Sequence, residues 1–282
     1  VNENLLLSKT KSEICVGLYK PYFYTELTTS QMLKDKRLYV EKLGLQFDPR
    51  FVREEIFFNG LLRGLQTLNF SYDIQDLENT SIESLLQFKQ LWITTTEFMD
   101  AGTQTLLATY VKRGGHLILY PVIPTLDLYL NECTIIKEEL NINFKKVASP
   151  NKVTVFGIED LFTVFREKQI FESEKNEIIA LTEAEETCGI RKKVGDGTVT
   201  ILGFAFGYTS DEHLHLYEKI ISLDGIKRAA KISDPDIQFV VRKGEKYSYM
   251  FLLNYHNQKK IFNVNSVKYT LKPFSCKIIK MK

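Results

Sequence analysis

Strand-like and helix-like segments alternate along residues 14–122, and this alternation limits the fold more than any other feature of the chain. Short apolar runs at 14–19, 91–95 and 116–122 are typical of buried strands. Over 52–68, apolar residues recur at three- and four-residue steps, which predicts an amphipathic helix. Alternating strands and helices with short connections favour a parallel α/β sheet.

Capping and turn residues predict where several helices and strands begin or end. Asp100 is expected to cap a helix that contains Leu106–Val111, and Gly114-Gly115 to end this helix with the left-handed backbone of a C-terminal cap. Further along, Asp196-Gly197 predicts a two-residue hairpin between two strands.

The pattern changes after Ser233-Asp234-Pro235, where short strands separated by Gly, Asn and Pro turns replace the alternation. No helical period persists there, which predicts a small all-β domain. We therefore expect an N-terminal extension at 1–13, an α/β domain at 14–230 and a C-terminal β domain at 231–282.

The charge distribution changes at the same place. Lys227–Lys282 contains 13 Lys and Arg against 3 Asp and Glu, whereas residues 1–226 contain 24 against 32. The formal net charge of +2 thus conceals an acidic first part and a basic second part. The basic residues are scattered through strands and turns, so we expect them to lie on solvated faces or to contact an acidic neighbour such as the first part, and we expect no nucleic-acid partner.

Several classes of site lack their sequence signature. The cysteines at 15, 133, 188 and 276 form no Cys-x-x-Cys pair, and His213 and His215 face different directions on a predicted helix, so no metal and no cofactor is expected. Neither Gly-x-Ser-x-Gly nor Gly-x-Cys-x-Gly occurs, and we assign no catalytic residue. The apolar runs are shorter than the ~20 residues of a membrane helix, so no membrane partner is expected. Free thiols without a signal-peptide pattern favour a cytoplasmic location.

Aromatic residues gather just past the first predicted strand. Open α/β sheets bind ligands at the carboxyl ends of their parallel strands, and the strand at 91–95 ends at the same edge. The candidates for a substrate cleft or an interface are Tyr19, Tyr22, Phe23, Tyr24, Glu26, Trp92 and Glu97. Stacking on a sugar, anchoring a protein partner and filling a domain junction all use such residues. A single carboxylate cannot perform glycosidase chemistry, which uses two.

Residues 51–127 carry a recognisable series of segments. Leu61–Leu68 is followed by Tyr72-Asp73-Ile74, by Leu91–Thr95 and by Leu107-x-x-Tyr110-Val111-Lys112-x-Gly114-Gly115-His116-Leu117-Ile118-Leu119. This series resembles the trimerisation, or class I glutamine-amidotransferase-like, domain that follows the catalytic barrel in microbial β-galactosidases of glycoside hydrolase families 42 and 35. Phe251–Asn257 is similar to a strand of their small C-terminal β domain. The segment Lys20–Leu27 is similar to archaeal exo-β-glucosaminidases, which makes an amino sugar a competitor to galactose.

The resemblance implies a mostly parallel, flavodoxin-like sheet with a non-catalytic role. The family's catalytic glutamates lie on a (β/α)8 barrel of ~250 residues, for which these two domains leave no room. Pro121-Val122 stands where an active amidotransferase places its cysteine, and Gly203–Gly207 lies near the position of its histidine.

The function expected from the resemblance is that of the C-terminal region of a β-galactosidase or exo-β-glucosaminidase. Such a region would support oligomerisation and shape the substrate cleft. Its expected partners are the catalytic barrel of the same enzyme, further copies of the chain in a homo-oligomer, and an oligosaccharide. The alternatives are a carbohydrate-binding module and an independent hydrolase or amidotransferase-like enzyme.

Overall fold

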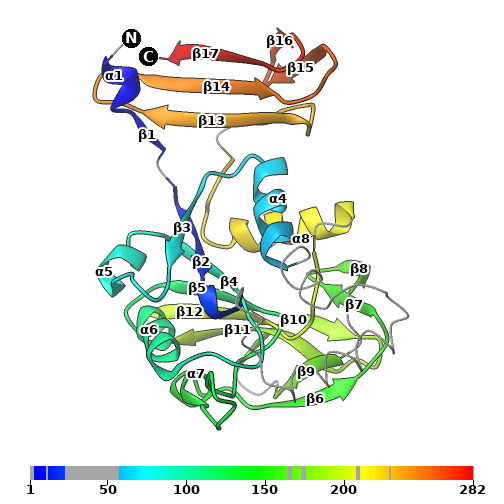
Figure 1. The fold of residues 1–282 in the computed structure, drawn as a ribbon. Coiled ribbons are helices and arrows are strands. Elements are labelled where there is room, and N and C mark those ends of the chain that lie inside the picture. The colour runs from blue at the N-terminus through cyan, green and yellow to red at the C-terminus, as the bar shows by residue number, and fades with distance from the viewer. Residues whose placement is uncertain are drawn as a thin grey trace.

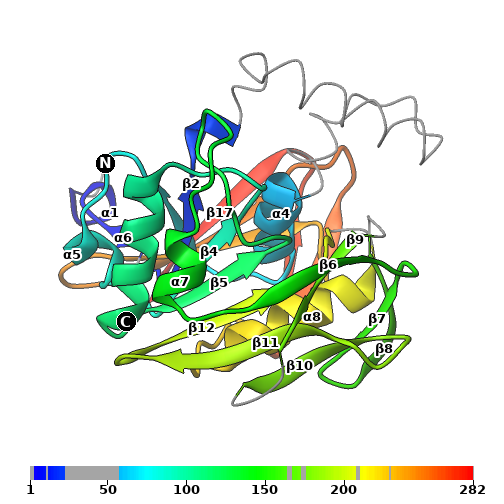
Figure 2. The same ribbon diagram turned by 90° about the horizontal axis from the view of Figure 1, so that it is seen from below.

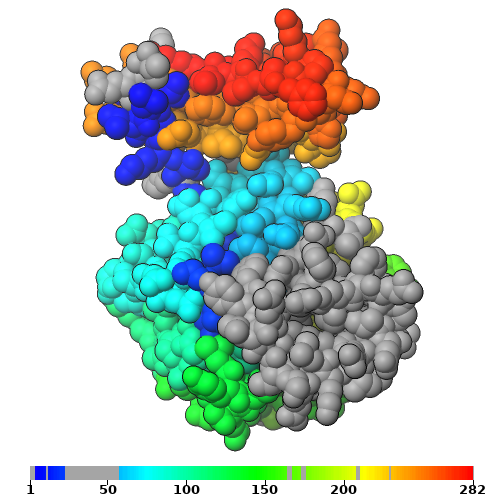
Figure 3. Space-filling model, in the orientation of Figure 1, coloured from blue at the N-terminus to red at the C-terminus, as the bar shows by residue number. Residues whose placement is uncertain are grey.

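The chain folds into a sheet-rich structure with few helices (Figure 1). The computed structural model describes residues 3–10, 12–22, 57–163, 167–172, 176–207, 210–228 and 230–281. A nine-stranded sheet forms the α/β part, and a four-stranded sheet lies at its end. Figure 3 shows the orange and red residues of the four-stranded sheet above the cyan residues of the α/β part.

One half of the nine-stranded sheet is parallel, and the alternation over residues 14–122 predicted this for four of its five strands, β12 being the exception. Its strands are β2 (Ile14–Leu18), β3 (Tyr72–Asp76), β4 (Gln90–Thr94), β5 (His116–Tyr120) and β12 (Gly197–Leu202). They lie in the order β3-β2-β4-β5-β12, and every neighbouring pair is parallel. Counted along the chain this is the order 2-1-3-4-5, which one class of doubly wound sheets uses.

The other half of the sheet is antiparallel, so the expectation of a mostly parallel sheet is wrong for these strands. They are β11 (Thr187–Val194), β10 (Glu177–Thr182), β7 (Lys152–Val155) and β8 (Ile158–Phe162). Each pairs antiparallel with its neighbours. The physical reason is that tight hairpins connect β7 to β8 and β11 to β12, and a two-residue link can join only antiparallel strands.

The hairpin between β11 and β12 is offset by one residue from its prediction. Val194 pairs with Gly197, so Gly195 and Asp196 form the turn. Gly195 has a positive φ of 61°, the backbone conformation that such turns require. A smaller ladder of β6 (Phe144–Ala148) and β9 (Glu167–Phe171) lies beside this half.

Helices cover both faces of the parallel half (Figure 2). On one face, α4 (Asn59–Thr67) and α8 (Asp211–Ser222) pack against Ile118 and Tyr120 of β5. On the other, α5 (Ile82–Leu85), α6 (Ala101–Lys112) and α7 (Ile135–Glu139) pack against Leu117 and Leu119. Because neighbouring residues of β5 face opposite cores, all five are buried, which explains its continuous apolar sequence.

The four-stranded sheet agrees with the strands predicted near the C-terminus, with one addition from the N-terminus. Its order is β1 (Lys9–Thr10), β13 (Ile237–Lys243), β14 (Ser248–Asn254) and β17 (Ser275–Met281). The hairpin of β15 (Lys260–Val264) and β16 (Val267–Leu271) completes a small core that contains Phe239, Leu252 and Phe262. Residues after α1 (Glu3–Leu6) thus pair with a strand more than 200 positions away.

Candidate functional site

The carboxyl ends of β2 and β4 form the edge at which the sequence places its candidate residues. Tyr19 follows β2 and is 1% exposed. Its hydroxyl donates to Oδ2 of Asp100 at 2.7 Å and accepts from the Asp100 amide at 3.0 Å. Asp100 caps α6, as predicted, because its Oδ1 accepts from the Thr103 amide at 2.9 Å. Tyr19 therefore fastens the end of β2 to the start of α6.

The Tyr19–Asp100 pair is a stable donor and acceptor rather than an acid–base pair. Burial raises the pKa of the Tyr19 hydroxyl well above its ordinary value. Burial by itself raises the pKa of the Asp100 carboxyl, but hydrogen bonds from Thr103 and Tyr19 outweigh it and hold the pKa below its ordinary value. At neutral pH the phenol thus keeps its proton and the carboxylate its charge, which suits a structural contact.

Tyr22 extends this contact into a small aromatic group. It ends the 3-10 turn η1 (Lys20–Tyr22), and its ring meets those of Tyr19 and Phe98 edge-on, with centroids 4.7 and 5.4 Å apart. Lys20 of the same turn forms an ion pair with Asp76 at the end of β3, 2.5 Å apart. The turn is therefore held at both ends.

A closed loop at this edge carries an aromatic residue that the sequence reasoning missed. The Asp127 carboxylate accepts from the amides of Tyr129 at 2.8 Å and Asn131 at 2.9 Å. Tyr129 is 84% exposed and Leu128 is 43% exposed. The spacing of Asp127 and Asn131 around Leu-Tyr-Leu is typical of a loop closed by an aspartate side chain, and could have indicated it.

The remaining candidates divide into three groups. Trp92 lies in the core, 0% exposed, where its Nε1 donates to Gln90 Oε1 at 3.0 Å, and this burial keeps it from a surface cleft. Glu97 is half-buried, and its carbonyl accepts from the Thr125 amide at 2.9 Å. Phe23, Tyr24 and Glu26 lie outside the described residues.

A Thr–His–Asp arrangement lies at the opposite edge of the sheet. His116, the first residue of β5, contacts Asp224 Oδ2 through Nδ1 and Thr200 Oγ1 through Nε2, the latter at 2.8 Å. Gln90, the first residue of β4, donates to Asp224 at 2.6 Å and to the Ile220 carbonyl of α8 at 3.0 Å.

This arrangement resembles a hydrolytic triad, but its surroundings exclude that role. Thr200 is 0% exposed and His116 is 4% exposed, so no substrate reaches the hydroxyl. Burial alone raises the pKa of Asp224, yet hydrogen bonds from His116 and Gln90 hold it below its ordinary value. The group connects the C-terminal end of α8 to the sheet.

The buried cysteines and the buried lysine are also poorly placed for nucleophilic chemistry. Burial raises the pKa of the Cys15 and Cys188 thiols to about 12, which keeps them protonated, whereas a nucleophilic cysteine acts as the thiolate. Burial lowers the pKa of Lys168 to about 8, but its Nζ donates to the Pro150 carbonyl at 2.8 Å and the residue is 1% exposed.

The part of the chain that the structure describes offers no cluster of metal ligands and no membrane-spanning helix. It contains no group of three or more His, Cys, Asp and Glu residues arranged to hold a metal ion. No helix in it has both the length and the apolar character needed to cross a bilayer.

Comparison with known proteins relates the chain to carbohydrate-active enzymes. Residues 41–178 match the family model described as "GLMA-like, second domain". The chain is 57% identical to a beta-1,2-glucosyltransferase of Ignavibacterium album, over 99% of the chain and 40% of that protein. It is 28% identical to an exo-beta-D-glucosaminidase of Pyrococcus horikoshii, over 90% of the chain and 32% of that protein.

The fold of the chain also occurs within solved structures of larger enzymes. The structure aligns with a catalytic mutant of Gan42B, a GH42 beta-galactosidase from G. stearothermophilus, with a TM-score of 0.72 and 11% identity over 97% of this chain and 40% of that one. At that identity the likeness shows the fold alone. According to these coverages, the chain spans less than half the length of each of these relatives. Exo-β-glucosaminidases were expected among the relatives from the sequence, whereas a glucosyltransferase was not.

Proposed function

We propose that the chain is a non-catalytic accessory region of a larger carbohydrate-active enzyme that handles β-linked glucosyl or glucosaminyl units. The observation that carries the proposal is the 57% identity over 99% of the chain to only 40% of a beta-1,2-glucosyltransferase. In this proposal a catalytic barrel lies outside the chain, and the α/β part is a flavodoxin-like, amidotransferase-like domain retained for assembly.

The chemistry of the described residues supports a non-catalytic role. The triad-like group is buried, and the thiols of Cys15 and Cys188 stay protonated because burial raises each pKa to about 12. Tyr19 and Asp100 hold the edge of the sheet together. None of these groups combines an activated nucleophile with access to solvent.

The proposed task of the α/β edge is to complete a substrate cleft or a contact between copies of the enzyme. Tyr129 supports this task, since it is 84% exposed on a loop closed by Asp127. A large aromatic ring held in place adds contact area at little cost in conformational entropy. The partners in this proposal are the catalytic barrel of the same enzyme and further copies of it.

A chimera tests the proposal. This chain replaces the matching 40% of the Ignavibacterium album beta-1,2-glucosyltransferase, and formation of β-1,2-linked glucosides is measured for the chimera and for the chain alone. We expect activity only from the chimera. Glucosyl transfer by the isolated chain, or its hydrolysis of a nitrophenyl glucosaminide or galactoside, would show that the chain is itself an enzyme.

The proposed role of the α/β edge is tested in the same chimera with the substitution Tyr129→Ala. We expect a raised KM or a smaller oligomer by light scattering, because the exposed ring no longer fills its contact. Tyr255→Ala is the matched control, since Tyr255 is 57% exposed and lies beyond β14 in the other sheet. Unchanged KM and oligomer size in Tyr129→Ala would remove the loop from the proposal.

A carbohydrate-binding module is the second candidate, and the same exposed ring of Tyr129 favours it. Calorimetric titration of the chain with β-1,2-linked glucooligosaccharides and chitooligosaccharides separates it from a pure assembly region. The fluorescence of Trp92 is unsuitable as the readout, because this residue is 0% exposed. Heat of binding that Tyr129→Ala removes would favour the module, and a flat titration would favour assembly.

A further inference from the structure

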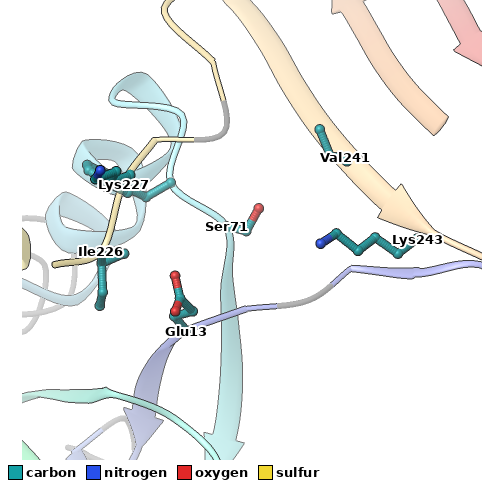
Figure 4. Close-up of a pocket in the computed structure, with 7 residues that line it drawn as sticks. Glu13, Ser71, Ile226, Lys227, Val241 and Lys243 are labelled. Carbon is teal, nitrogen blue, oxygen red and sulfur yellow. The ribbon is translucent and has the colours of Figure 1, made fainter. Parts of the chain in front are cut away.

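A cleft of about 300 Å³ lies between the α/β part and the four-stranded sheet (Figure 4). The α/β side supplies Glu13, Phe70, Ser71, Ile226 and Lys227, and β13 supplies Val241 and Lys243. Ile226 is 6% exposed and Phe70 is 7% exposed, so they form an apolar floor beneath charged walls. The cleft therefore joins the two parts of the molecule and combines apolar with cationic groups.

The charges in the cleft are unbalanced. Within the described residues, neither Lys227 nor Lys243 has an ion-pair partner, and both are exposed. The carboxylate of Glu13 is already paired with Lys89 at 2.6 Å. In Figure 4 the Lys243 side chain extends from β13 toward Ser71. The lining of the cleft thus carries the two lysines against one carboxylate, that of Glu13.

The pairing of β1 with β13 places another lysine next to Lys243. Lys9 lies directly opposite Lys243 in the antiparallel ladder. Like charges at opposite positions of two strands destabilise the pair, and a bound anion relieves this repulsion.

The arginines next to these two lysines in the sequence already have partners within the protein. Arg228, next to Lys227, pairs with Glu218 at 2.6 Å and lies over the Phe70 ring. Arg242, next to Lys243, donates to the Ser8 carbonyl. The basic second part was expected to contact the acidic first part, and the Arg228–Glu218 ion pair is such a contact, whereas no ion pair in the described part of the chain joins β13–β17 to the α/β part. Lys227 and Lys243 therefore remain available for a ligand.

We propose that this cleft binds a small molecule that carries a phosphate group beside a sugar-sized body, such as a sugar phosphate. Lysines bind phosphate as point charges, and Ser71 offers a hydroxyl to the same group. The volume is at the lower end of that of small-molecule sites, which often lie between domains. Because the lysines come from both parts, the ligand holds the two parts together. The site does not depend on the proposed function, since binding is a property of the chain itself.

The test is calorimetric titration of the full chain with glucose 6-phosphate, inorganic phosphate and glucose at constant ionic strength. We expect glucose 6-phosphate to bind more tightly than phosphate, because the apolar floor contacts the sugar, and glucose not to bind. Lys227→Gln and Lys243→Gln are each expected to weaken glucose 6-phosphate binding roughly tenfold. Binding is also expected to raise the Tm of the parent chain and not that of Lys243→Gln.

Lys246→Gln is the matched control, since Lys246 is an exposed lysine in the turn after β13 and does not line the cleft. Unchanged circular dichroism establishes that each variant is folded. Equal binding by all three variants and the parent chain, no binding of either phosphate, or equally tight binding of glucose would overturn the proposal. None of these results bears on glucosyl transfer by the chimera, so the two proposals fail separately.

Discussion

Buried glutamines hold the loops and helices of the α/β part in place. Gln104 donates from Nε2 to the carbonyls of Met99 at 2.8 Å and Cys133 at 2.9 Å, and its Oε1 accepts from the Ile136 amide at 3.1 Å. Gln169 accepts from the Ile123 amide at 2.8 Å. Each side chain satisfies backbone groups of segments that lack a strand partner, which a buried apolar residue could not do.

Hydrogen bonds to the Asp224 carboxylate make the stability of the folded chain depend on pH. Its pKa is lowered in the folded chain, because hydrogen bonds from His116 and Gln90 outweigh its burial. The contribution is therefore present above the pKa of an unfolded aspartate, about 3.9, and is lost as the pH falls through the folded value. We expect Asp224→Asn to lower the free energy of unfolding by about 1–2 kcal/mol at pH 7.

Urea unfolding at several pH values measures this effect. The curves of Asp224→Asn and the parent chain should converge as the pH falls from the unfolded value of about 3.9 through the lower pKa of the folded chain, because the parent carboxyl becomes protonated over this range. Fluorescence reports the transition, since Trp92 is the single tryptophan and its indole bonds to Gln90 of the same network. Glu159→Gln, an exposed carboxylate, is the control. A difference that stays constant with pH would show that charge at Asp224 is not the cause.

At the scale of elements, glycines decide how closely helices and hairpins approach. A Cβ on Gly64 of α4 would lie 2.8 Å from ring carbons of Tyr217 on α8. A Cβ on Gly197 would lie 2.1 Å from the Val111 carbonyl of α6. The β11–β12 hairpin therefore rests directly on the end of α6, where the Asp196 amide donates to the Lys112 carbonyl at 3.1 Å.

Gly64→Ala tests the packing of α4 against α8. Alanine favours the helix by about 1 kcal/mol, but overpacking costs about 1–3 kcal/mol. The Tyr217 ring is 0% exposed and its hydroxyl meets that of Tyr120 at 3.3 Å, so it has little room to move. We expect a net loss of stability by thermal unfolding. Arg63→Ala, on the exposed side of α4, is the control and should change stability by less than about 0.5 kcal/mol. Stabilisation by Gly64→Ala would mean that the helices separate easily.

At the scale of the whole molecule, the N-terminal residues belong to the sheet formed by the C-terminal ones. Lys9 and Thr10 pair with β13, and Arg242 donates to the Ser8 carbonyl. Figure 1 shows this segment running from the four-stranded sheet down to β2, and a second link leads from α8 to β13. Two stretches of chain therefore connect the parts on either side of the cleft.

Deletion of residues 1–10 tests this arrangement. We expect faster amide hydrogen exchange in β13, because its outer edge loses the partner strand and becomes open to water. Exchange in β5 is the internal control, since this strand lies at the centre of the other sheet. The variant Lys9→Ala, which keeps the strand and removes one charge, should not speed exchange in β13. Unchanged exchange after the deletion would show that β1 contributes nothing to the sheet.

Local patterns were sufficient for much of the fold and little of the site. The apolar runs located β2, β4 and β5, and Asp100 was identified as the cap of α6. Among the candidate residues, Tyr19 and Tyr22 do lie together at the predicted edge, whereas Trp92 packs in the core. The exposure of Tyr129 depends on a loop closed by side-chain hydrogen bonds, which carries no periodic signal.

The sequence by itself determined four of the five parallel strands of the large sheet, the change to an all-β segment and the excess of basic residues that follows. These features are local, because the burial of a strand and the charge of a segment are written in neighbouring residues. Tertiary structure decided the antiparallel half, the partner of β1 and the cleft between the two parts. Each of these depends on contacts between residues far apart in the chain, such as Lys9 and Lys243, and such contacts leave no periodic trace in a single sequence.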